Sequence, residues 1–171
     1  QAQTPHAVRF GVAGRWELHK VADEVPVIPL PDAWVDHVYC EGVLHHLSHP
    51  GAILREFHRV LRPGGTAAVM VYNYDSVYLH LLVAYQRQVI EGLGGPVEEA
   101  FRRTTDRASS PPISIPYRPR DFTALCRLAG FEVEFRGGYF DRRELDLYRT
   151  ITIDERLAPE LLDVDRDLIE L

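Results

Sequence analysis

The feature that most constrains the fold of this chain is a strand, helix, turn and strand pattern over residues 35–74. Residues 35–40, VDHVYC, are a short run rich in β-branched and aromatic residues, and the run ends at Glu41 and Gly42. Such a run is typical of a buried parallel strand. From Pro50 onward, apolar residues recur at helical spacing, which predicts an amphipathic helix: Ile53, Phe57, Val60 and Leu61.

The residues after this helix complete the pattern. Residues 62–65, RPGG, predict a turn, because proline does not continue a helix and glycine accepts left-handed backbone. Residues 66–74, TAAVMVYNY, predict a second buried strand. A strand joined to the next strand by a helix is the unit of a parallel sheet, and its crossover is almost always right-handed. The fold class is therefore α/β.

The flanking segments predict further elements with less regular patterns. Before the βαβ unit we expect a helix at 5–13, a strand at 16–22 and a proline-rich loop at 23–33. After it we expect a helix at 76–91 and a long loop or lid-like insert around 92–120, rich in Gly, Pro, Ser and Arg.

The last part of the chain repeats the helix, glycine and strand order. A helix closed by Gly130 should bury four side chains and lead into a strand at 131–136: Phe122, Leu125, Cys126 and Leu128. The charged segment 141–171 has strand character at 147–153 and helix character at 155–170. We read residues 1–171 as one partial domain.

Composition narrows the classes of function. The 171 residues carry a net charge of -6, which disfavours nucleic acid as a general partner. Two distant cysteines suit reduced buried thiols rather than a disulfide framework or a metal pair. We find neither a signal peptide nor an uninterrupted apolar run of about 18 residues. We therefore expect a cytoplasmic chain with no membrane association, and its oligomeric state stays open.

Three linked motifs carry a resemblance to a known family. These motifs are LPD at 30–32 before the first strand, GVLHH at 42–46 after it, and RVLRPGG at 59–65 before the next strand. With this spacing, residues 29–72 resemble the later half of class I S-adenosylmethionine-dependent methyltransferases, in particular the type 11 group of ubiquinone C-methyltransferase-like enzymes. A weaker likeness at 117–135 extends the resemblance to roughly residues 4–136.

The resemblance implies a fold and a reaction. It implies a Rossmann-like three-layer sandwich with a mainly parallel sheet, and transfer of a methyl group from S-adenosylmethionine to a small-molecule acceptor. It also implies cofactor contacts from two places: Asp23 and Glu24 near the adenine, and Glu41, Gly42 and Val43 near the methionine part. A solvated acidic loop and a simple turn at Gly42 are the structural alternatives.

One departure from the family is marked. The glycine-rich loop that contacts the cofactor, and the acidic residue that binds its ribose, have no counterpart in the sequence. We therefore expect an N-terminally truncated methyltransferase fold. The alternative is a noncatalytic remnant or fragment that acts as a binding module.

The side chains at the carboxyl ends of the strands are the candidates for chemistry. His46, and next to it His45, are the candidate catalytic bases, because imidazole exchanges protons readily near neutral pH. Both could instead be packing residues. Tyr72, Asn73 and Tyr74 follow the second strand and are candidate acceptor contacts, with tyrosines closing a core as the alternative.

A metal site is not expected at these histidines. His45, His49 and Glu41 would share one face only on a helix, and Pro50 and Gly42 disfavour helical backbone there.

Overall fold

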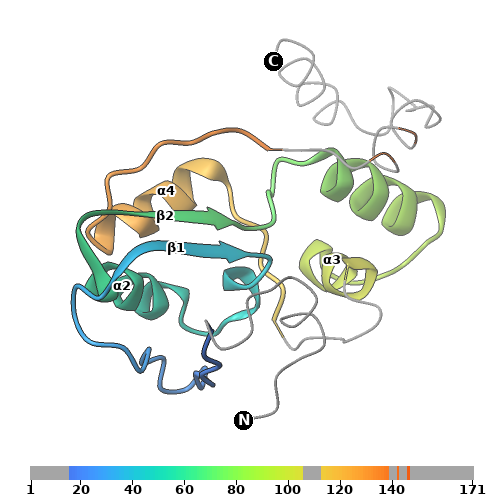
Figure 1. Ribbon diagram of the computed structural model, residues 1–171. Coiled ribbons are helices and arrows are strands. Elements are labelled where there is room, and N and C mark those ends of the chain that lie inside the picture. The colour runs from blue at the N-terminus through green and yellow to red at the C-terminus, as the bar shows by residue number, and fades with distance from the viewer. Residues whose placement is uncertain (1–15, 106–112, 139–141, 143–145, 147–171) are drawn as a thin grey trace.

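The computed structural model describes residues 16–105 and 113–138, together with residues 142 and 146. The predicted helices at 5–13 and 155–170 and the predicted strand at 147–153 lie outside the described residues. The described elements follow one another in the order shown in Figure 1: β1 (Val35–Glu41), η1 (Leu44–His46), α2 (Pro50–Val60), β2 (Leu61–Met70), η2 (Tyr78–Ile90), α3 (Val97–Thr105) and α4 (Pro119–Leu128).

The two strands form a parallel pair, which confirms the predicted α/β class and the βαβ unit. Val35 pairs with Leu61 and His37 with Thr66, so residues 62–65 bulge opposite Asp36 alone. The ladder then runs in register from Thr66 to Met70. The residues of the predicted RPGG turn thus form a bulge in β2, which connects α2 to the paired part of the strand.

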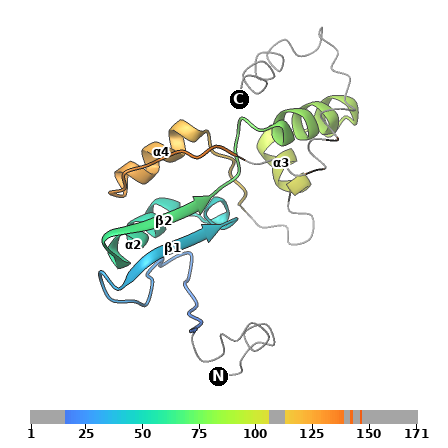
Figure 2. The same cartoon turned by 45° about the horizontal axis from the view of Figure 1, so that its top comes forward.

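One core lies between the sheet and two helices. Figure 2 shows α2 and α4 beside the two strands. Cys40 and Val38 of β1 pack with buried residues of α2 and of α4 with the residue that follows it: Ile53, Leu54, Phe57, Cys126 and Ala129. Pro50 occupies the first turn of α2 and Pro119 the first turn of α4, positions where a missing N–H costs nothing. The other face of β1 is open, and Tyr39 on it is 69% exposed.

A second, smaller core joins η2 and α3, which lie together beyond the ends of the strands (Figure 1). η2 confirms the predicted helix at 76–91, although it is of the π type, with the Glu91 N–H donating to the Gln86 carbonyl at 3.0 Å. Leu79 and Val83 of η2 pack against Ala100 and Phe101 of α3.

The predicted loop at 92–120 is wrong in part, because α3 lies inside it. Glu98 and Glu99 occupy the first turn of α3, and Arg102 and Arg103 the last, which complements the helix dipole. Glu99 accepts hydrogen bonds from both arginines at 2.7 Å. The charged and glycine-rich composition conceals this helix, whose inward face is only Ala100 and Phe101.

Two predicted strands are also wrong. Residues 16–22 are irregular, and Leu18 is 83% exposed, because no neighbouring strand pairs with them in the described part of the chain. Residues 131–136 form no ladder either, although Phe131 and Val133 pack against the main core. The strand predicted at 66–74 is confirmed as far as Met70, and Asn73 then pairs with Tyr117 instead.

The helix predicted before Gly130 is confirmed as α4. Its end has the expected glycine, with the Gly130 N–H donating to the Arg127 carbonyl at 3.0 Å and the Phe131 N–H to the Cys126 carbonyl at 3.2 Å. Cys126 is buried as predicted, but Leu128 is 83% exposed, and Ala129 takes the buried position.

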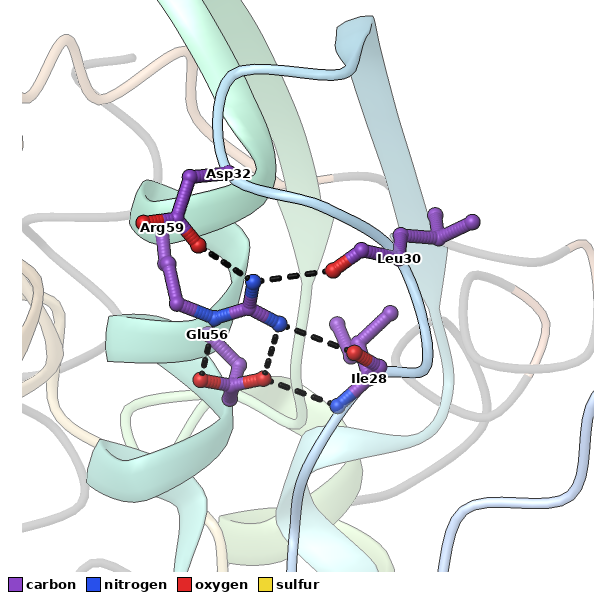
Figure 3. Close-up of polar contacts among 5 residues, drawn as sticks. All are labelled: Ile28, Leu30, Asp32, Glu56 and Arg59. Carbon is purple, nitrogen blue, oxygen red and sulfur yellow. Dashed lines mark hydrogen bonds and ion pairs between the residues drawn. The ribbon is translucent and has the colours of Figure 1, made fainter.

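The loop before β1 is held against α2 by a partly buried hydrogen-bond network, drawn in Figure 3. Arg59 donates to the carbonyl oxygens of Ile28 and Leu30, at 2.8 and 2.9 Å, and to the carboxylate of Asp32 at 2.7 Å. Glu56 accepts the Ile28 N–H at 2.8 Å. This network fixes the proline-rich residues that lead into the sheet.

Candidate functional site

The site begins where β1 ends, at Glu41, Gly42 and Val43. Gly42 has a φ of 72°, and nothing lies within 4 Å of where a Cβ on it would stand. A ligand can therefore approach this backbone closely, as the methionine part of the predicted cofactor would require. Glu41 is exposed, and its carboxylate accepts a hydrogen bond from the Tyr39 hydroxyl.

The short helix η1 carries both candidate histidines, and Tyr72 brings the exit of β2 against them. The imidazole of His45 is fully buried and stacks on the Tyr72 ring, with the ring centroids 3.7 Å apart. The Tyr72 N–H donates to His45 Nδ1 at 3.3 Å. His46 meets the His45 ring edge-on at 4.2 Å. The structure thus places three of the predicted site residues in one aromatic cluster.

A segment that the sequence did not single out completes this cluster. Residues 113–117, here called the strap, run along the exits of both strands. The Ile115 N–H donates to the His45 carbonyl at 3.0 Å, and the Tyr117 N–H donates to the Tyr72 carbonyl at 2.8 Å. His46 Nδ1 lies 2.9 Å from the Ile113 carbonyl oxygen. The sequence signal for an extended segment here is the spacing of two isoleucines around Ser114, with prolines on both sides, in PPISIPY.

Asn73 and Tyr74 lie next to the cluster but outside its stack. The side-chain oxygen of Asn73 accepts the Asp75 N–H at 3.0 Å, which closes a local turn. The Tyr74 N–H donates to the Tyr117 carbonyl at 2.9 Å. The guanidinium of Arg118 lies 4.7 Å from the centre of the Tyr74 ring, a cation–π contact.

The predicted adenine contacts are apart from this cluster. Both carboxylate oxygens of Asp23 accept the Ser48 N–H, at 3.1 Å each, and one also accepts the Ser48 hydroxyl. These hydrogen bonds hold the pKa of Asp23 below its ordinary value. Asp23 therefore ties the loop before β1 to the loop after η1, while Glu24 is exposed.

An open groove of about 360 Å³ lies beside the strap. Its walls are the start of α3 and the first part of the strap: Pro96, Glu98, Glu99, Arg102, Ile113, Ser114 and Ile115. Ser114 connects this groove to the cluster, because its hydroxyl lies 3.4 Å from His46 Nδ1.

Within the described residues no group of three or more His, Cys, Asp or Glu side chains is arranged to hold a metal ion. No described helix has both the length and the apolar character needed to cross a membrane.

The fold and the site together define an α/β protein whose candidate chemistry lies beyond the carboxyl ends of parallel strands. Residues 11–69 match the family model described as a methyltransferase domain. This segment, about a third of the chain, is therefore similar to the methyltransferase domain family.

A solved structure is also similar: a chain in the complex between the Haloferax volcanii Trm112 methyltransferase activator and a methyltransferase. The match has 21% identity and a TM-score of 0.38, and it covers 60% of this chain. It spans 35% of the length of that chain. A likeness at this level carries no argument about function.

Proposed function

We propose that this chain contributes to an enzyme that transfers a methyl group from S-adenosylmethionine to a small-molecule acceptor. The observation that carries the proposal is the methyltransferase-domain match over residues 11–69, which ends within β2. The open backbone at Gly42 fits the same proposal, since nothing occupies the space in front of it.

S-adenosylmethionine supplies a methyl group on a positively charged sulfur. In the transfer, a lone pair of the acceptor forms the new bond to the methyl carbon while the sulfur–methyl bond breaks, and S-adenosylhomocysteine leaves. This reaction needs alignment of the acceptor and exclusion of water more than it needs a strong base. We propose Glu41, Gly42 and Val43 as contacts of the methionine part, and Asp23 and Glu24 as contacts of the adenine.

The acceptor would lie beyond the exit of β2. We propose Tyr72, Asn73 and Tyr74 as its contacts, because their aromatic faces offer an apolar wall with polar tips. The proposal that His46 or His45 takes up a proton from the acceptor stays a prediction. His45 is the less suited of the two, because its ring is fully buried and its Nδ1 accepts the Tyr72 N–H.

Calorimetric titration with S-adenosylhomocysteine tests the proposal directly. We expect micromolar binding, and Glu41→Ala should weaken it. Glu134→Ala is the matched control, because Glu134 pairs with Arg136 on the exposed segment after α4 and should leave the affinity unchanged. Absence of binding by the unsubstituted chain would count against the proposal and favour the noncatalytic binding module.

A further inference from the structure

We propose that His46 is a positioning residue that anchors the strap, residues 113–117, to η1. The anchor is the hydrogen bond between His46 Nδ1 and the Ile113 carbonyl oxygen, at 2.9 Å. The role of this anchor in a functional site rests on the proposed methyl-transfer function. The anchoring of the strap does not depend on that function.

The partner of Nδ1 determines where the ring carries its proton. A carbonyl oxygen only accepts hydrogen bonds, so Nδ1 must carry the hydrogen. In the neutral ring Nε2 then has the lone pair. The edge-on contact with His45, at 4.2 Å, and the edge-on contact with Tyr72, at 5.7 Å, fix the plane of the ring. The ring is thus oriented to hold Ile113.

The strap continues from this anchor along both strand exits. The Ile115 N–H bonds the carbonyl of His45, and Tyr117 exchanges hydrogen bonds with Tyr72 and Tyr74 through its N–H and its carbonyl oxygen. Asn73 and Tyr117 form a parallel bridge. Backbone hydrogen bonds therefore join segments that are distant in sequence in one ladder. His46 adds a side-chain hydrogen bond to Ile113, the first residue of the strap.

This ladder controls the backbone on which the proposed site depends. η1 follows directly after Gly42 and Val43, and Tyr72 and Tyr74 belong to the proposed acceptor contacts. Loss of the anchor would therefore loosen the backbone around η1 and the backbone from Tyr72 to Tyr74 at the same time. Methyl transfer is sensitive to such loosening, because its rate depends on alignment of the reacting atoms.

Three substitutions of His46 separate anchoring from the other properties of an imidazole. The amide nitrogen of asparagine lies near the position of Nδ1 and can donate to the Ile113 carbonyl, whereas the longer glutamine places its amide near Nε2. His46→Asn should therefore keep the anchor. His46→Gln and His46→Ala should lose it.

Amide hydrogen exchange measured by NMR reads out the strap without any ligand. In His46→Ala and His46→Gln, exchange of the Ile115 and Tyr117 amides should accelerate about fivefold, because the lost bond is worth roughly 1 kcal/mol. In His46→Asn these rates should stay within about threefold of the original. The Ala129 amide, which bonds Leu125 in α4, is the internal control.

Two outcomes of the exchange experiment would overturn the anchor. One is an unchanged rate at Ile115 and Tyr117 in His46→Ala. The other is an equal acceleration at Ala129, since that result would show general destabilisation rather than release of the strap.

Affinity for S-adenosylhomocysteine separates the positioning role from the proposed function. We expect His46→Ala to bind about fivefold more weakly, the equivalent of one lost hydrogen bond, and His46→Asn to bind as the original chain does. If His46→Asn keeps the strap ordered but loses as much affinity as His46→Ala, the ring acts by contact with the ligand and the positioning role is refuted. If the unsubstituted chain binds no S-adenosylhomocysteine, the proposed function fails, and the exchange rates still decide the anchor.

Discussion

The guanidinium of Arg59 and the carboxylate of Glu56 lie about one turn apart on α2 and meet in two hydrogen bonds, of 2.8 and 2.7 Å. Both partners also bond the backbone of Ile28, Arg59 to its carbonyl and Glu56 to its N–H. The hydrogen bonds from Arg59 are the main cause that lowers the pKa of Glu56. The pair therefore works as one clamp on the loop that leads into β1.

The first prediction concerns this clamp. Arg59→Ala should lower the midpoint of thermal unfolding, because it removes bonds to two backbone carbonyls as well as to Glu56 and Asp32. Arg62→Ala is the matched control, since Arg62 pairs with Asp36 on the exposed surface. Equal midpoints for the two variants, measured by circular dichroism, would show that the clamp does not stabilise the loop.

The second prediction concerns the main core. Leu54 is 1% exposed and belongs to the cluster between the sheet, α2 and α4. Leu54→Ala should lower the free energy of unfolding by about 2–4 kcal/mol, through lost burial and the cavity left behind. Leu128→Ala, at an 83% exposed site, should change it by less than about 0.5 kcal/mol. Urea unfolding followed by fluorescence measures both, and a large loss at Leu128 would contradict the burial pattern.

Leu54 and Leu128 also show how far the sequence could predict the fold. The apolar residues of α2 recur strictly at helical spacing, and the structure buries Ile53, Phe57 and Val60 as predicted. In α4 the same reasoning failed at the last turn. The chain there turns at Gly130, so Ala129 rather than Leu128 faces the core.

The site was predictable only in the parts that local sequence controls. Residues at the carboxyl ends of adjacent parallel strands must lie close, so the meeting of His45, His46 and Tyr72 follows from the βαβ pattern. The strap did not follow from it, because its bonds to His45 and to Tyr72 join residues far apart in sequence through backbone atoms. Backbone bonds leave no side-chain pattern by which they could be recognised.

The third prediction concerns the bulge that links α2 to the sheet. A Cβ on Gly65 would lie 2.9 Å from the Arg62 carbonyl oxygen and 3.0 Å from the Asp36 carbonyl oxygen, and backbone cannot easily give way. Gly65→Ala should therefore cost about 1–3 kcal/mol of stability. Gly94→Ala meets nothing within 4 Å and should cost less than about 0.5 kcal/mol. Equal urea midpoints for the two variants would argue against a tight bulge.

The fourth prediction concerns the two thiols. Cys40 and Cys126 are both buried in the main core, and burial raises the pKa of each. The thiolate is the reactive form, so both should react with iodoacetamide at least about tenfold more slowly in the folded chain than in urea. Mass spectrometry of peptides resolves the two sites. Rapid labelling of either cysteine in the folded chain would show that the core around that cysteine opens readily.

The fifth prediction concerns Asp23 and acid. Its pKa lies below the ordinary value of 3.8, chiefly because the Ser48 hydroxyl and N–H donate to the carboxylate. A carboxylate with a lowered pKa in the folded state stabilises the fold above its unfolded-state pKa. That contribution disappears as the pH falls through the folded-state pKa.

Asp23→Asn should accordingly be less stable than the original chain above pH 3.8, and the difference should shrink as the pH falls below that value. Glu132→Gln, an equivalent change of acid to amide at an exposed site, is the matched control. Thermal unfolding midpoints measured between about pH 2.5 and pH 7 compare the three chains across the range in which carboxylates titrate. A constant difference between Asp23→Asn and the original chain over the whole range would mean that the charge of Asp23 is not what holds Ser48. The tie between the two loops would then depend on the shape of the side chain alone.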